Sequence, residues 1–256
     1  MPHHHNRRML LGLLGAGMAA PVFAAPPISD VHLEEIIARH VAALGGAAAL
    51  RGIRSKAVDL QIVEKDQVVH ARYRCNKIPA FRIDIYDKGG HVFCEGLDGK
   101  GPWIWPGNAP AARQGVPDAE RTGIEGVEFN LYGLDAFPAL GNKLTLDGRE
   151  TIEGVNYYVL RVDLKDSYRT FLYIDPDSWM IARRRDFRAN HPDLNSTKQR
   201  LETQYSDFRR VGGIRNAFLQ HQVDLSNGRI TQVQIVDRME YNPMPDNVFD
   251  RAKKLD

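Results

Sequence analysis

A run of three arginines is the one concentration of charge in the sequence that could recognise an anion. Arg183, Arg184 and Arg185 follow one another in a segment that alternates like a strand. Because alternate residues of a strand point to opposite faces, such a run is typical of a solvated strand edge that discourages pairing with a second sheet. The alternative is a patch that docks an acidic protein partner or lipid headgroups. The sequence leaves both interpretations open.

Signatures of the common catalytic and nucleotide-binding sites are missing from the sequence. There is no G-x-S-x-G, P-loop, H-E-x-x-H, C-x-x-C or G-x-G-x-x-G pattern. The histidines after residue 30 are scattered, and no pair has the spacing of metal ligands. We therefore expect a protein that is not an enzyme and that uses no metal or other cofactor. A hydrolase is the weaker alternative.

The two cysteines lie on separate predicted strands. Cys75 falls on the second strand and Cys94 on the fourth. A disulfide needs Cα atoms within about 7 Å, whereas strands two apart in a simple meander are separated by roughly twice 4.8 Å. We therefore expect two buried free thiols. A disulfide remains the alternative, because an exported protein would meet an oxidising compartment.

The composition is that of an ordinary globular protein. Of the 256 residues, 43% are hydrophobic and 26% are charged, and the formal net charge is +2. These values exclude a disordered or collagen-like chain and argue against a strongly basic protein that binds nucleic acid. Binding to nucleic acid is therefore not expected.

The first 24 residues have the pattern of a cleavable signal peptide. Arg7 and Arg8 precede an apolar stretch from Met9 to Phe23, and Ala24 offers a cleavage site. Residues 6–11 also loosely match a twin-arginine export signal, which leaves the export route open. Cleavage would leave residues 25–256, about 232 residues with a formal charge of zero, which we expect to form a single domain.

The remaining chain reads as one helix followed by many strands. Apolar residues recur at helical spacing from Leu33 to Leu44, and Gly45-Gly46 ends the pattern. From Ser55 onward the period changes to alternation, with turn residues about every ten positions. Beyond the strand that begins at Ser55, the expected strands are 68–75, 81–86, 91–97, 103–105, 143–152, 156–164, 169–175, 179–187, 199–208, 216–225 and 230–241. About 11 or 12 antiparallel strands should curl strongly, toward a half-barrel or barrel.

Residues 107–141 interrupt this meander. The segment begins polar and Pro-rich and then becomes apolar. A connection this long inside a domain is usually functional or has structure of its own. We expect short helices that lie over the concave face of the sheet, and we call residues 107–141 the lid. The alternative is a plug that only completes the core.

Five stretches of the sequence together resemble the exported lipoprotein-sorting proteins of the LolA and LolB type. They are HVAALGGAAALRGIRS, IPAFRIDIYDKGGHVFCEGLDGKGPWIWP, FLYIDPDSWMIARR, YSDFRRVGGIRNAFLQHQV and MEYNPMPDNVFD. The second contains a D-G-x-x-x-W pattern from Asp98 to Trp103. The resemblance implies a mainly β fold with an N-terminal helix: a strongly curved, unclosed antiparallel barrel, covered by helices with an apolar cavity beneath them.

The resemblance also implies a function. It predicts a soluble periplasmic carrier, since the anchoring Cys of the membrane-bound branch is missing. The cargo would be a lipid or an acylated lipoprotein moved toward the outer membrane. An inner-membrane transporter and an outer-membrane acceptor would be its partners, and we expect a monomer. The alternative is a periplasmic binding module that senses lipid or lipoprotein and signals through a protein partner, with the arginine run as its interface.

An apolar cavity suits such cargo because each methylene of an acyl chain costs about 0.8 kcal/mol to expose to water. The lining residues that we expect from the sheet are Ile83, Ile85, Phe93, Trp103 and Trp105, and those from the lid are Phe129, Leu131, Leu134 and Phe137. Core packing is the alternative role for each of them.

Overall fold

The computed structural model describes residues 31–251, apart from residues 66, 190–191 and 244–245. The signal peptide predicted for residues 1–24, with its twin-arginine pattern, lies outside the described residues. Within the described ranges, no helix is long and apolar enough to cross a membrane.

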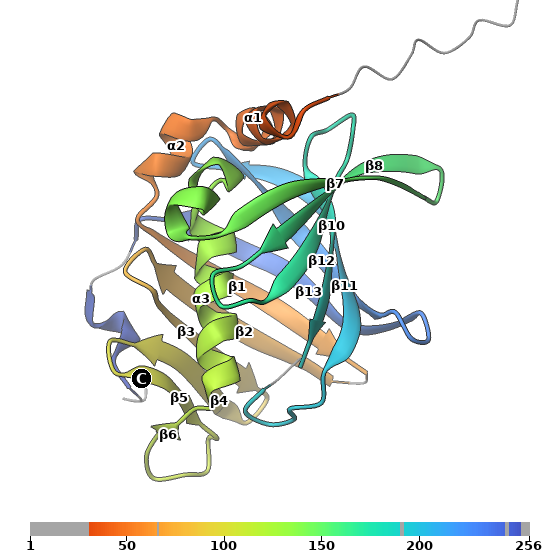
Figure 1. The fold of residues 1–256 in the computed structure, drawn as a ribbon. Helices are drawn as coiled ribbons and strands as arrows, with labels where there is room; N and C mark the ends of the chain where they lie inside the picture. Colours follow the sequence, from red (N-terminus) through yellow and green to blue (C-terminus); the bar gives the residue numbers. More distant parts are fainter. Residues whose placement is uncertain (1–30, 66, 190–191, 244–245, 252–256) are drawn as a thin grey trace, which may run out of the picture. The chain divides into compact units, whose positions relative to one another are not determined.

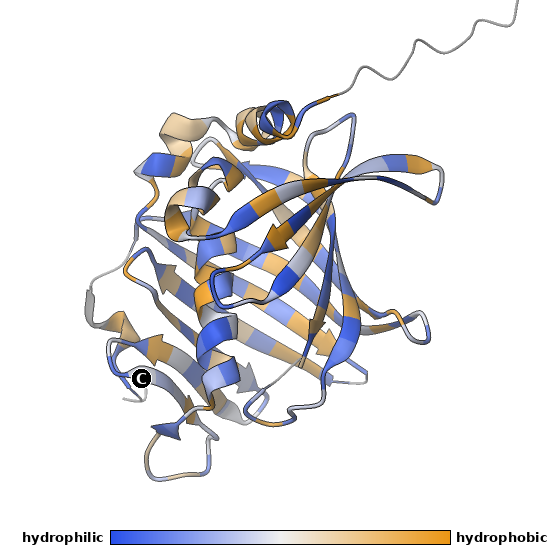
Figure 2. Cartoon of the chain, viewed as in Figure 1, coloured by the Kyte–Doolittle hydropathy of each residue, from blue (hydrophilic) through white to orange (hydrophobic). Residues whose placement is uncertain are grey.

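Alternating burial organises most of the chain into strands, and Figure 2 shows hydrophobic and hydrophilic residues alternating along them. The N-terminal strands are β1 (Ser55–Glu64), β2 (Gln67–Asn76), β3 (Ala80–Asp87), β4 (Gly90–Asp98), β5 (Gly101–Trp105) and β6 (Arg113–Gln114). The C-terminal strands are β7 (Lys143–Ile152), β8 (Val155–Asp163), β9 (Arg169–Ile174), β10 (Ile181–Arg188), β11 (Gln199–Val211), β12 (Ile214–Asp224) and β13 (Arg229–Tyr241).

All these strands belong to one antiparallel sheet. Its order is β6-β5-β4-β3-β2-β1-β13-β12-β11-β10-β9-β8-β7, so nearly every strand pairs with its neighbours in sequence. The pairing of β1 with β13 joins the N-terminal and C-terminal halves. In the described part of the chain, β6 and β7 each pair on one side only, so the sheet is not closed. The structure thus confirms the curved, unclosed, mainly β fold. Its thirteenth strand is the two-residue β6, which was not predicted.

Helices cover the sheet at several places. They are α1 (Leu33–Leu44), α2 (Ala47–Gly52), α3 (Pro117–Leu131) and the 3-10 helices η1 (Leu134–Leu140) and η2 (Asp246–Phe249). Helix α1 ends at Gly45, whose φ is 137° and where an added Cβ would lie 2.7 Å from the carbonyl oxygen of Gly213. Only glycine fits this position, because a side chain would clash in a conformation that it rarely adopts.

The lid contains one substantial helix where we expected only short ones. Pro117 begins α3, a position where its missing N–H costs no hydrogen bond, and α3 continues for 15 residues before η1 follows. The sheet curls around α3, which runs across the strands β1–β3 in Figure 1. At Gly123 the helix comes so close to the sheet that an added Cβ would lie 2.1 Å from the Phe81 ring.

The arginine run does not lie at an edge of the sheet. Strand β10 carries Arg183, Arg184 and Arg185 between β9 and β11. Their side chains are only 12%, 13% and 26% exposed. The interpretation as a solvated strand edge is therefore wrong. Sequence alternation identified the strand but carried no information about its neighbours.

The prediction for the cysteines is confirmed. Cys75 and Cys94 are both buried and free. They lie on β2 and β4, which β3 separates.

Candidate functional site

A cavity of about 410 Å³ lies between α3 and the concave face of the sheet. Its volume falls toward the lower end of the range of small-molecule sites, which is about 300–1,000 Å³. The apolar part of its lining is Leu44, Val58, Leu60, Ile62, Tyr73, Ile83, Phe129, Tyr132, Leu134, Leu172, Met180, Ile181, Phe208, Ala217, Val236 and Met239. The polar part is His40, Lys56, Asn130, Arg184, Tyr205, Arg215, Asn216, Gln220 and Gln234.

One strand supplies both a charge and an apolar wall to this cavity. On β1, every second residue from Lys56 through Val58 and Leu60 to Ile62 is buried and lines the cavity. The pleat of a strand places such residues on one face. The inward row of β1 therefore begins with an ammonium group and continues with three aliphatic side chains.

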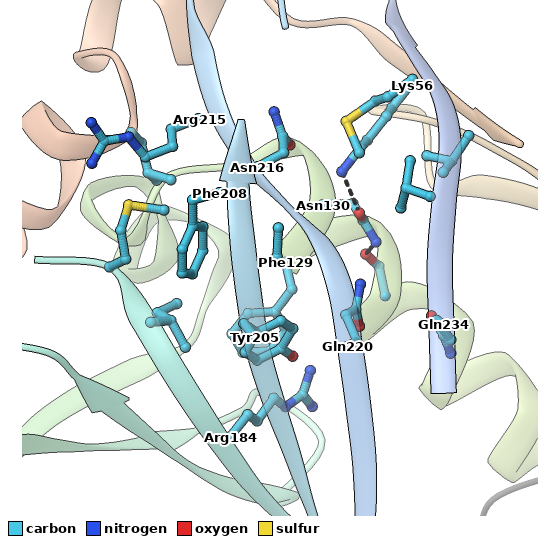
Figure 3. Close-up of a pocket in the computed structure, with 18 of the residues that line it drawn as sticks. Lys56, Phe129, Asn130, Arg184, Tyr205, Phe208, Arg215, Asn216, Gln220 and Gln234 are labelled. Atoms are coloured by element: carbon cyan, nitrogen blue, oxygen red, sulfur yellow. Dashed lines mark hydrogen bonds between the residues drawn. The ribbon is translucent and has the colours of Figure 1, made fainter. Parts of the chain in front are cut away.

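Helix α3 closes the cavity from the side opposite β1. Phe129 and Asn130 line it, and the Lys56 ammonium donates to Oδ1 of Asn130 at 2.9 Å (Figure 3). The amide nitrogen of Asn130 donates to the carbonyl oxygen of Gly126 at 2.8 Å. This second hydrogen bond fixes the amide so that its oxygen faces Lys56.

A second cation, Arg184, lines the cavity from β10, but carboxylates neutralise it. Its Nη2 lies 3.5 Å from Glu125 and its Nε 3.1 Å from Asp186. The guanidinium also lies 4.2 Å from the centre of the Phe129 ring, a distance at which a cation is attracted to an aromatic face. Arg184 is thus a structural link between β10 and α3.

Ion pairs hold α3 to the C-terminal half of the sheet. Glu125 lies 3.5 Å from Arg184 of β10, and Glu128 pairs with Lys165 at 2.6 Å. Arg121, which donates to Glu125 at 2.8 Å, is itself on α3. Burial raises the pKa of Glu125 to about 7, although Arg184 and Arg121 oppose the rise. The opposite side of α3 packs on Phe81 through Gly123. The helix therefore bridges the two halves of the sheet.

The structure brings some of the expected lining residues to the cavity. Ile83, Phe129 and Leu134 line it. Leu131 and Phe137 are fully buried, at 0% exposure, and are not among its lining residues. Their burial is that of core side chains.

The remaining expected residues lie elsewhere on the sheet. Ile85 packs against a buried cluster contributed by β1, β2, β12 and β13, and Phe93 stands opposite Ile85 in the register of β3 and β4. Neither is among the residues that line the cavity.

Trp103 and Trp105 stand in the alternate row of the sheet. They are in register with Gly96 and Cys94, whereas Ile83 is in register with Glu95. Because successive residues point to opposite faces, the two tryptophans point away from the face that carries Ile83. The Trp103 ring instead faces the guanidinium of Arg82 at 5.6 Å.

Several residues of the site were not predicted from the sequence, and Lys56 is the clearest case. It has the same parity as Val58, Leu60 and Ile62, so the alternation that predicted β1 also placed Lys56 on the inward face. A lysine in the apolar row of a strand is the signal that could have identified it. Nothing in the sequence places Asn130 opposite Lys56, since the two are 74 residues apart.

A cluster on the convex face has the donor types of a metal site. Asp84, His91 and Cys94 each offer one ligand atom, and these atoms lie within 4.8 Å of one another. Arg82, however, donates to both carboxylate oxygens of Asp84, at 2.8 and 2.9 Å. Its positive charge opposes a cation beside the same carboxylate. We therefore assign this cluster a structural role.

Arg183 and Arg185 lie in the alternate row of β10 from Arg184. Both pair with Glu202 at 2.7 Å, and Arg185 also pairs with Glu150 at 2.9 Å. These partners neutralise the two arginines within the protein itself.

No protein-family model matches the chain, and a search of curated proteins finds no match. Solved structures do match. A domain described as an outer-membrane lipoprotein-sorting protein from Vibrio parahaemolyticus aligns with a TM-score of 0.56 at 10% identity, covering 84% of this chain and 95% of that one. A LolA superfamily protein from Nitrosomonas europaea aligns with a TM-score of 0.53 at 12% identity, covering 84% and 96%.

A third structure, a DUF1329 family protein from Desulfovibrio piger, aligns with a TM-score of 0.50 at 12% identity and covers 85% of this chain and 96% of that one. At these identities the agreement concerns the course of the backbone. It extends over nearly the whole length of each matched chain. The chain described here therefore has the fold of the LolA superfamily.

Proposed function

We propose that this protein is a non-enzymatic periplasmic carrier that binds the acyl chain of a lipid or lipoprotein in the cavity under α3. The cavity between α3 and β1 is the observation that supports the proposal most directly, because one wall is a continuous aliphatic row. Transfer of an acyl chain from water to such a wall is favourable by about 0.8 kcal/mol per methylene. The fold, shared with a lipoprotein-sorting domain, supports the same role.

Release of the cargo requires that the cover can move. On one side α3 is held to the sheet by ion pairs of Glu125 and Glu128, and on the other by packing of Gly123 against Phe81. Ion pairs and a close glycine contact can separate without unfolding a strand. An inner-membrane transporter and an outer-membrane acceptor would be the partners that load and unload such a carrier.

The test is uptake of an uncharged apolar dye, N-phenylnaphthylamine, combined with native mass spectrometry of protein purified from the periplasmic fraction. We expect the wild-type protein to enhance the dye's fluorescence and to carry a co-purified lipid. The variant Ala217→Trp should abolish both, because Ala217 lines the cavity and the indole would fill it. Ala111→Trp is the matched control, since Ala111 is exposed.

Transfer between vesicles separates a carrier from a static binding module. The protein should accelerate movement of a labelled lipid from donor to acceptor vesicles, and Ala217→Trp should remove the acceleration. Retention of lipid without acceleration would favour the sensing module instead. A protein that is always empty and takes up no dye would contradict the proposed function altogether.

A further inference from the structure

Lys56 is a buried cation inside an otherwise largely apolar wall. Its exposure is 7%, and the structure gives its ammonium one hydrogen-bond acceptor, Oδ1 of Asn130 at 2.9 Å. The ring of Tyr241 lies 5.9 Å away. An ammonium has three donors, so two of them remain for another acceptor.

Carboxylates neutralise the other buried cation of the cavity, but none neutralises Lys56. Arg184 has Glu125 and Asp186. Across the described part of the chain, no carboxylate forms an ion pair with Lys56. Burial accordingly lowers the pKa of Lys56 to about 8. A buried charge without a counter-ion is costly, and an anion bound beside it would recover that cost.

The rest of the inward row of β1 is apolar and suits the alkyl chain of an amphiphile. From Lys56 to Ile62 the strand advances six residues, roughly 20 Å at about 3.3 Å per residue, and the three side chains after Lys56 in the row are aliphatic. Met239 and Val236 of β13 stand beside Val58 and Leu60 and extend this apolar wall. The cavity volume of about 410 Å³ favours one acyl chain over the two chains of a phospholipid.

We propose that the cavity takes a long-chain carboxylic acid, with its carboxylate on the Lys56 ammonium and its alkyl chain along Val58, Leu60 and Ile62. This inference rests on the proposed function, because it assigns the headgroup of the molecule whose acyl chain the cavity binds. Asn130 holds the ammonium in place, and its own amide is fixed by Gly126. The ion pair would form in a site shielded from water, where charge-assisted hydrogen bonds are strong.

The experiment compares laurate with dodecanol, which has the same chain without the charge, by displacement of N-phenylnaphthylamine. The wild-type protein should bind laurate about tenfold or more tightly than dodecanol. In Lys56→Met, which keeps the length of the side chain, the preference for laurate over dodecanol should be lost. Lys56→Arg should retain a preference for laurate. Lys143→Met, at an exposed position of β7, should behave as wild type.

Other results would contradict either the headgroup assignment or the proposed function, and the two can be told apart. Equal affinity of the wild type for laurate and dodecanol would overturn the headgroup assignment and leave the proposed function intact. Failure of both ligands and of the dye to bind would contradict the proposed function itself. Tighter binding of dodecyl phosphate than of laurate would overturn the choice of a carboxylate. Melting curves show whether Lys56→Met is folded. If it is not, Lys56→Gln provides a second uncharged variant.

Discussion

The side chains of Lys56 and Asn130 join the sheet to the helix that covers it, through a hydrogen bond of 2.9 Å from Nζ to Oδ1 (Figure 3). Asn130 is the acceptor that the structure gives the buried ammonium. A displacement of α3 would therefore remove that acceptor and expose the cavity in the same movement. This contact therefore links the position of α3 to the presence of a hydrogen-bond acceptor for the Lys56 ammonium in the cavity.

Binding of laurate should depend on the protonation of Lys56. Burial lowers the pKa of Lys56 to about 8, so its ammonium is charged below that pH and neutral above it. We expect the laurate affinity to fall about tenfold between roughly pH 7 and pH 9.5. Dye displacement at several pH values measures this change. Dodecanol is the control ligand, because its affinity should not follow the titration.

The tyrosine, cysteine and histidine side chains near Lys56 keep their protonation states between roughly pH 7 and pH 9.5. Burial raises the pKa of Cys75 to about 11 and that of Tyr241 to about 12, and it raises the pKa of Tyr73 well above its ordinary value. All three stay protonated. His40, which also lines the cavity, has a pKa lowered by burial and is already neutral. Lys56→Arg should bind laurate equally across the range, and a fall in that variant would contradict the assignment to Lys56.

Replacing either of two glycines of α3 by alanine should change the free energy of unfolding, in opposite directions. A Cβ at Gly123 would lie 2.1 Å from the Phe81 ring, so Gly123→Ala should lower the free energy of unfolding by about 1–3 kcal/mol. A Cβ at Gly126 would lie 3.8 Å from the Tyr73 hydroxyl, an ordinary contact. Gly126→Ala should therefore raise the free energy of unfolding by up to about 1 kcal/mol, because alanine has a higher helix propensity than glycine. Denaturant titration measures both, and equal effects would show that Phe81 does not limit the approach of α3.

Glu125 should make stability depend on pH in a defined direction. Burial raises its pKa from 4.5 to about 7, so between these values the folded chain retains a proton that the unfolded chain releases. Its contribution to stability is complete below about pH 4.5 and is lost as the pH rises through about 7. The loss is on the order of 2–3 kcal/mol.

The variant Glu125→Gln isolates this effect. Its free energy of unfolding, measured by urea titration at about pH 5 and pH 8, should fall less with rising pH than that of the wild type. Other titrating groups contribute equally to both proteins and cancel in the comparison. Identical pH dependence of the two proteins would assign the change to other residues.

Substitutions on the two faces of the sheet should separate stability from binding. Trp103 is 1% exposed and faces Arg82, so Trp103→Phe should lower the free energy of unfolding by about 1–3 kcal/mol without changing dye affinity. Phe129 lines the cavity, so Phe129→Ala should alter dye affinity more than it alters stability. Loss of dye binding in folded Trp103→Phe would place this tryptophan in the site.

The period of hydrophobicity in the sequence predicts most of the fold. Alternation of Val58, Leu60 and Ile62 identified β1 and its inward face, and the turn spacing indicated a curved meander. The two-residue strand β6 has too few residues to show a period. The length of α3 was hidden as well, because Gly123, Glu125 and Glu128 interrupt its apolar pattern while each makes a specific contact in the fold.

The cavity was less predictable, because its lining depends on register. Trp103 and Ile83 are both large and apolar, yet the pairing of β3, β4 and β5 places them in alternate rows. A shift of one residue would exchange those rows. Size and hydrophobicity therefore could not distinguish Ile83, which lines the cavity, from Trp103, which does not.

The wall of the cavity is complete only after β13 has paired with β1. Lys56 stands opposite Tyr241, and most of the chain lies between them. Contacts between residues so distant in sequence form slowly, because a long loop must close before they stabilise the fold. The wall beside Val58 and Leu60 requires Met239 and Val236 from the last strand. A chain whose last strand has not yet paired thus lacks the part of the cavity wall that Met239 and Val236 supply, and the complete wall exists only in the finished fold.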